Sequence, residues 1–206
     1  MLNFHVKISP MSPSSGKISR RIIIGIIGHP SCGKDTVGEY LRDKYSFTLA
    51  AGGDLLRQYI SEHDLGDTSR ENLSKVSREL RRKKGSDFLM KMQLAIDTLK
   101  LAVSGMRTAP EAELLKSAGG KIIAVTAPVE IRYKRALGRG RIGDNVTFED
   151  FKLIEEKEAK SADLNDHSVE DLMAMSDFMI NNSGTFVELQ KEVDRIVKEI
   201  LKEVGR

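Results

Sequence analysis

The chain has 206 residues, of which 40% are apolar and 31% are charged, a composition typical of a globular protein with a sizeable core. The net charge of +3 is too small to indicate nucleic-acid binding by itself, and a single cysteine excludes an internal disulfide. No apolar run approaches the roughly 20 residues that a membrane span requires.

Residues 1–20 are rich in Ser, Pro and Lys and lack the apolar stretch of a signal peptide. We therefore expect a flexible leader over residues 1–20 and a single domain over residues 21–206. We also expect a cytoplasmic protein with no membrane partner, acting as a monomer or homodimer.

Short β-branched runs alternate with helical patterns along the rest of the chain, which indicates a parallel sheet flanked by helices. The expected strands are 22–27, 47–50, 101–104, 122–125 and 178–180. The expected helices are 34–44, 54–63, 70–83, 86–99, 110–117, 129–138, 147–160 and 185–203. The predicted fold is α/β, a three-layer α/β/α sandwich around a five-stranded parallel sheet.

The first expected strand leads into a segment with the spacing of a phosphate-binding loop, Gly28-His29-Pro30-Ser31-Cys32-Gly33-Lys34-Asp35-Thr36. Glycines let the backbone curl around an anion, and the N–H groups and dipole of the next helix face that anion. Lys34 adds a mobile positive charge for the β- and γ-phosphates. We predict an ATP site to which the following residues contribute: Gly28, Pro30, Ser31, Cys32, Gly33, Lys34, Asp35 and Thr36.

Two segments interrupt the alternation of strands and helices. The first is an insertion of about fifty residues, about 53–100, between the second and third strands, and the second is a short basic segment over about 139–146. Long insertions on an α/β sheet are where substrate sites and lids occur. We expect a helical acceptor-binding insertion and a short lid that close around two substrates and exclude water.

Four motifs follow one another between residues 28 and 185: Gly33-Lys34-Asp35-Thr36, Gly53-Asp54-Leu55-Leu56-Arg57, Arg135-Ala136-Leu137-Gly138-Arg139 and Asn182-Ser183-Gly184-Thr185. In this order they resemble the motifs of adenylate-kinase-like nucleoside monophosphate kinases, phosphate-loop enzymes that transfer the γ-phosphoryl group of ATP. The last motif is also similar to the Asn-x-Gly turn of dephospho-coenzyme-A kinases.

The resemblance implies roles for the residues of these motifs. Arg57, with Gly53, would hold the acceptor phosphate by a bidentate guanidinium contact, unless it is a solvated helix arginine. Arg135 would stack on the donor adenine, beside which Asn182 and Gly184 would lie. Arg139 and Arg141 would neutralise charge on the transferred group, with Arg141 also reaching the acceptor; the alternative for Arg141 is a basic helix end.

The chain departs from the usual phosphate-loop pattern at two positions: one lacks the usual acid, and the other carries an acid in place of Ser or Thr. The third strand ends at Ser104, where such enzymes carry an acid that orients Mg²⁺. Asp35 occupies the position of a metal-binding Ser or Thr, so it either orients Mg²⁺ through water or stabilises the helix N-terminus. Asp54 is the other acid near the strand ends, for the metal or for the acceptor. Arg107 would hold the acceptor phosphate together with Arg57.

The densest basic run, Arg78-Glu79-Leu80-Arg81-Arg82-Lys83-Lys84, has no aromatic partners for base stacking. We interpret it as a helix C-terminus complemented by cations and stopped by Gly85, in preference to a nucleic-acid patch or an acceptor site lined by Arg78 or Arg81. Nucleic acid is therefore not an expected partner.

The predicted activity is Mg²⁺-dependent, in-line transfer from ATP to a nucleoside or deoxynucleoside monophosphate, with Lys34, Arg57, Arg107 and Arg139 as catalytic residues. The expected partners are thus small-molecule nucleotides. One alternative is phosphorylation of a hydroxyl, as in dephospho-coenzyme-A kinases, with Asp54 as the base. The other alternative is an ATP-binding regulatory or assembly protein with weak ATPase activity. It is favoured by Ser104, which stands where an acid is usual.

Overall fold

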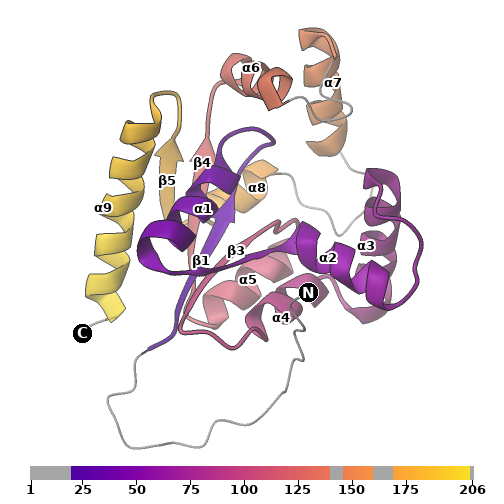
Figure 1. The fold of residues 1–206 in the computed structure, drawn as a ribbon, viewed down its shortest axis with the longest axis horizontal. Coiled ribbons are helices and arrows are strands. Elements are labelled where there is room, and N and C mark those ends of the chain that lie inside the picture. Colours follow the sequence, from indigo (N-terminus) through magenta and orange to yellow (C-terminus); the bar gives the residue numbers. More distant parts are fainter. Residues whose placement is uncertain (1–19, 140–145, 160–168, 205–206) are drawn as a thin grey trace, which may run out of the picture.

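The computed structural model describes residues 20–139, 146–159 and 169–204. Its centre is a five-stranded sheet in which all neighbouring strands are parallel, in the order β2-β3-β1-β4-β5 (Figure 1). The strands are β1 (Ile22–Ile27), β2 (Thr48–Ala51), β3 (Lys100–Ser104), β4 (Lys121–Thr126) and β5 (Phe178–Asn181). The predicted fold class is confirmed, and each expected strand is present to within one residue at either end.

The central strand β1 is buried along its whole length because helices cover both faces of the sheet. Successive side chains of a strand point to opposite faces. Ile24 and Ile26 pack with residues of α1 (Lys34–Tyr45) and α9 (Phe186–Val204), whereas Ile23 and Ile27 pack with α4 (Phe88–Leu94), α5 (Ala109–Ser117) and α8 (Val169–Ala174). The result is the three-layer arrangement visible in Figure 1.

The insertion between β2 and β3 forms a small core of its own. It consists of α2 (Gly52–Glu62), α3 (Arg70–Lys84) and α4, which pack through Leu56, Ile60, Val76, Leu80 and Leu89. Helix α3 ends as expected at Gly85, whose φ is 101° and whose N–H donates to the Arg81 carbonyl at 2.9 Å. Helices α6 (Val129–Arg139) and α7 (Phe148–Ala159) lie beyond the carboxyl ends of the strands (Figure 1).

Two helices differ from the sequence expectation. The helix expected over 86–99 is the shorter α4, because the Arg21 guanidinium takes up the carbonyls of Leu94 at 2.8 Å and Ile96 at 2.7 Å at its C-terminal end. Helix α8 was not expected, since six residues with one buried side chain, Leu172, carry little periodic signal. No helix in the described ranges is both long and apolar enough to cross a membrane.

Candidate functional site

The loop between β1 and α1 lies at the carboxyl end of the central strand. Helix α1 begins at Lys34, and its first hydrogen bond runs from the Val37 N–H to the Gly33 carbonyl at 3.1 Å. The N–H groups of this first turn have no partner within the helix, so together with the helix dipole they favour an anion at the loop. Pro30 lies in the loop and is partly buried.

Two glycines of the loop are required by space and by backbone conformation. A Cβ on Gly28 would collide with the Val125 carbonyl and lie 2.7 Å from Cys32 Sγ, and a Cβ on Gly33 would collide with the Asn182 amide. Their φ angles, 149° and 101°, also disfavour any side chain. The loop is therefore tightly fitted between β4 and the end of β5.

Ser31 has features expected of an anion-binding loop. Its φ of 59° is left-handed, and its Oγ is buried without a hydrogen-bond partner in the described part of the chain. A buried hydroxyl without a partner has a cost in free energy that a bound oxygen would remove. The loop thus fits a phosphate group.

The carbonyl oxygen of Cys32 joins the loop to two distant parts of the chain. It accepts a hydrogen bond from Asn182 Nδ2 at 2.8 Å and one from Arg135 Nη1 at 3.4 Å. Asn182 follows β5 and Arg135 lies in α6, so two residues predicted to contact ATP lie at the loop. The Cys32 side chain is fully buried, and burial raises the pKa of its thiol, so the thiol is structural.

The first turn of α1 presents three polar side chains. Lys34 and Thr36 are partly buried, whereas Asp35 is exposed. Exposure of Asp35 agrees with both predicted roles, the contact to Mg²⁺ through water and the stabilisation of the helix N-terminus. The described residues contain no group of three His, Cys, Asp or Glu side chains that could hold a metal ion. A single carboxylate fits Mg²⁺ held mainly by water and substrate phosphates.

The predicted acceptor residues follow the carboxyl ends of β2 and β3, of which β3 is the neighbour of the central strand β1. A Cβ on Gly105 would lie 3.4 Å from the Gly52 Cα, so the start of α2 and the loop after β3 are in close contact. Arg107 follows Gly105 by two residues in this loop, and its side chain is exposed. The acceptor-side motifs thus begin at the carboxyl ends of β2 and β3, the end of the sheet that also carries the phosphate-binding loop.

Arg57 and Asp54 form an ion pair on the surface of α2. Arg57 Nη1 lies 2.7 Å from Asp54 Oδ1, and the two side chains are 50% and 76% exposed. Such exposed pairs contribute little to stability, so both side chains are available to a ligand.

The structure gives less information on the remaining predicted residues, Arg139, Arg141 and Gly184. Arg139 is the last residue of α6 and is exposed, while Arg141 and most of the expected lid lie outside the described residues. Gly184 has a structural explanation, because a Cβ there would collide with the Glu188 carboxylate, which accepts from the Thr185 N–H at 2.7 Å at the start of α9.

Sequence reasoning missed Arg132, whose charge acts on His29 and Cys32 of the phosphate-binding loop. It is 7% exposed, donates from Nε to the Ala127 carbonyl at 2.9 Å and forms an ion pair with Glu155 of α7. Arg132 precedes Arg135 by three residues and therefore lies on the same side of α6, a signal the sequence carried. Burial, followed by the charge of Arg132, lowers the pKa of His29 although Glu170 lies 3.2 Å away.

Helix α3 has the basic last turn that was expected, but one of its cations, Arg81, is buried. This residue is 8% exposed and lies 3.7 Å from the carboxylate of Glu111, which is itself 1% exposed. The other basic residues of the run are exposed, as expected for a helix C-terminus.

Comparison with known proteins gives a family match and several similar folds. Residues 24–163 match the model of a family described as an AAA domain. A UPF0200/UPF0201 protein of Archaeoglobus fulgidus is 29% identical over 191 residues, which are 88% of this chain and 57% of that protein. The chain thus spans little more than half of this relative. A UPF0200 protein of Thermococcus gammatolerans is 28% identical over 195 residues, 90% of this chain and 98% of the relative.

Two solved kinases share the fold at low sequence identity. Shikimate kinase from Bacteroides thetaiotaomicron has a TM-score of 0.58 at 14% identity, covering 88% of this chain and 98% of its own. Dephospho-CoA kinase from Campylobacter jejuni has a TM-score of 0.51 at 16% identity, covering 88% and 98%. At these identities the likeness shows a shared fold.

Proposed function

The chain belongs to the AAA-domain family, and from this premise we propose that it is an ATP-dependent kinase that phosphorylates a nucleoside or deoxynucleoside monophosphate. The donor is ATP, the acceptor is the monophosphate, and the products are ADP and a nucleoside diphosphate.

The observation that carries the proposal is the meeting of three elements at the Cys32 carbonyl. The phosphate-binding loop supplies this carbonyl, and Arg135 of α6 and Asn182 after β5 both donate hydrogen bonds to it. The loop supplies N–H groups for the phosphates, the arginine supplies a planar cation for the adenine, and the amide supplies directional hydrogen bonds. These are the chemical groups that ATP requires at its two ends.

The acceptor assignment is supported by the contact between Gly52 and Gly105. It joins the helix that carries Arg57 to the loop that carries Arg107, and both arginines are exposed. Two guanidinium groups on neighbouring segments suit a dianionic phosphate, because each can bind two oxygens at once.

The proposed chemistry is in-line transfer without a covalent intermediate, in which positioning and charge neutralisation lower the barrier. Lys34 would follow the β- and γ-phosphates, and Arg139 would face the transferred group while it carries its greatest charge. Asp35 and Asp54 would hold Mg²⁺ through water, and the ion would supply further charge neutralisation at the phosphates.

The test is a coupled ADP-release assay with AMP, CMP, UMP, GMP, their deoxy forms and dephospho-coenzyme A as acceptors. Lys34→Ala should abolish transfer while the thermal unfolding midpoint stays near that of wild type, because the lysine contributes charge at the phosphates and little packing. Lys191→Ala, at an exposed position of α9, is the matched control and should retain full turnover. Near-native turnover in folded Lys34→Ala would refute the kinase assignment.

Two alternatives make different demands on the same side chains. Asp54, 76% exposed near the strand ends, is accessible as a base for a hydroxyl acceptor, and in that case dephospho-coenzyme A would be the preferred acceptor and Asp54→Asn would abolish transfer. Ser104 in place of an acid favours an ATP-binding regulatory protein, which would hydrolyse ATP slowly and respond to no acceptor.

A further inference from the structure

A buried acid lies next to the acceptor side of the sheet and has no part in the proposed chemistry. Glu111 is in the first turn of α5 and is 1% exposed. Burial raises the pKa of its carboxyl group, against the opposing effects of Arg81 and two backbone N–H groups. An acid in such a place has an energetic cost unless its contacts compensate it.

The contacts of Glu111 extend beyond those of a helix cap. Its Oε2 accepts from the Thr108 N–H at 3.1 Å, and Thr108 Oγ1 accepts from the Glu111 N–H at 3.3 Å, which together form a capping box. The same Oε2 also accepts from the Arg107 N–H at 2.6 Å. Arg107 lies outside the helix, so this shorter bond fixes the loop and not the helix.

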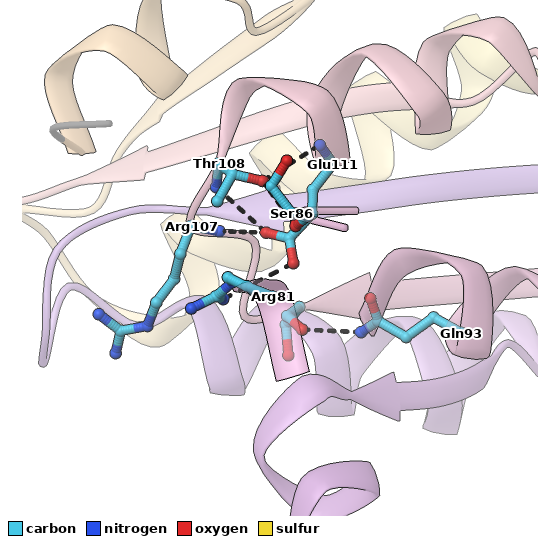
Figure 2. A network of polar contacts seen from close by, with 7 residues as sticks. Arg81, Ser86, Gln93, Arg107, Thr108 and Glu111 are labelled. Carbon is cyan, nitrogen blue, oxygen red and sulfur yellow. Dashed lines mark hydrogen bonds and ion pairs between the residues drawn. The ribbon is translucent and has the colours of Figure 1, made fainter. Parts of the chain in front are cut away.

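Glu111 and Thr108 also contact the insertion between β2 and β3. Glu111 Oε1 faces Arg81 Nη2 of α3 at 3.7 Å, and Thr108 Oγ1 donates to the carbonyl of Ser86, which lies between α3 and α4, at 3.1 Å. Figure 2 shows these contacts together, with the guanidinium of Arg107 extending away from the carboxylate. Glu111 therefore joins the insertion, through Arg81, to the backbone N–H of Arg107. The side chain of Arg107 points away from the Glu111 carboxylate.

A stabilising role alone does not explain this arrangement. Buried ion pairs are often no better for stability than apolar residues of similar size, because the loss of hydration offsets the attraction. What an apolar pair would lack is the ability to hold the Arg107 N–H in one place.

We propose that Glu111 is a positioning residue of the acceptor site, which sets the place of Arg107 and connects it to the insertion through Arg81. The inference rests on the proposed function, in which Arg107 binds the acceptor phosphate. Movement of the insertion would then move Arg107. Loss of the Glu111 carboxylate would weaken binding of the acceptor while leaving the ATP site intact.

The test compares two double variants that both remove the buried charges. Arg81→Met/Glu111→Met keeps the packing volume and removes every acceptor for the Arg107 N–H, whereas Arg81→Met/Glu111→Gln retains an amide oxygen for it. The first should raise the KM for the acceptor about tenfold, as expected for loss of a hydrogen bond to a charged group, with the KM for ATP within about twofold of wild type. The second should recover most of that loss.

A structural role would move these readouts differently. If Glu111 only stabilises the fold, the two double variants would have the same acceptor KM and would differ in unfolding midpoint alone. The difference between them should disappear in an Arg107→Ala background, because the positioned side chain is then gone. Glu113→Met, at an exposed position of the same helix, is the control and should leave both KM values unchanged.

The outcomes separate this inference from the proposed function. Wild-type transfer with an equal acceptor KM in the two double variants overturns the positioning role alone. A wild-type protein that transfers phosphate to no acceptor of the panel overturns the proposed function, and this inference with it.

Discussion

Replacement of Gln93 by methionine should destabilise the protein by about 2–4 kcal/mol, because one buried amide serves two strands. Gln93 is 2% exposed, and its Nε2 donates to the Ala50 carbonyl at 2.8 Å and to the Ser104 carbonyl at 2.9 Å. Ala50 and Ser104 lie near the carboxyl ends of β2 and β3. Methionine has a similar length and shape but no donor.

The magnitude follows from the two carbonyls that lose this donor. A buried polar group left without its partner costs about 1–3 kcal/mol, and the added apolar burial of methionine offsets part of the sum. For a chain of this size, each kcal/mol lowers the unfolding midpoint by about 2–4 °C, so the expected decrease is about 5–15 °C.

Thermal and urea unfolding of the variant, followed by circular dichroism, measure the effect. Gln58→Met is the matched control, because Gln58 is exposed on α2 and donates to Glu62 of the same helix at 2.7 Å. Its stability should stay within about 0.5 kcal/mol of wild type. If Gln93→Met is as stable as this control, the two carbonyls do not depend on Gln93 and the reasoning is wrong.

Three further predictions concern the candidate site. Asp35→Asn should raise the Mg²⁺ concentration for half-maximal activity, whereas an unchanged titration would assign Asp35 to the helix N-terminus alone. In a two-substrate kinetic matrix, Arg57→Ala should raise the KM for the acceptor about tenfold or more and leave the KM for ATP unchanged. An effect of Arg57→Ala on the KM for ATP alone would contradict the acceptor assignment. Arg139→Ala should lower kcat. Because burial and Arg132 lower the pKa of His29, the native state binds fewer protons than the unfolded state, and stability should fall as pH drops below about 6.5. His29→Gln should flatten that decrease in urea unfolding midpoints, and an unchanged slope would show that other groups cause it.

The sheet could be predicted from the sequence because its strands carry their own signal. The run 22–27 is apolar on both faces, as a central parallel strand must be, and it leads into a glycine-rich loop of recognisable spacing. Arg135 and Asn182 belong to motifs with a fixed order along the chain, so they could be assigned to the adenine side of the ATP site before any contact was known. Their roles, like those of Arg57 and Arg107, stay predictions.

What the sequence did not reveal depends on contacts between distant residues. The end of α4 is set by Arg21, which lies 73 residues before Leu94. The pairing of Arg81 with Glu111 depends on how the insertion packs against α5. Arg81 lies in a basic helix end and Glu111 in the first turn of a helix, and each position has a common local explanation. Nothing in either segment of the sequence indicates that the two side chains pair.

The bond between Asn182 and Cys32 has a consequence for the C-terminal part of the chain. Asn182 also donates its backbone N–H to the Thr126 carbonyl at 2.7 Å, so its side chain reaches the phosphate-binding loop only while β5 is in register with β4. Occupation of the loop and docking of the C-terminal strand and helix are therefore thermodynamically linked, and each must favour the other to the same extent. A bound nucleotide would thus protect β5 and α9 from proteolysis, including the part of α9 that it does not touch.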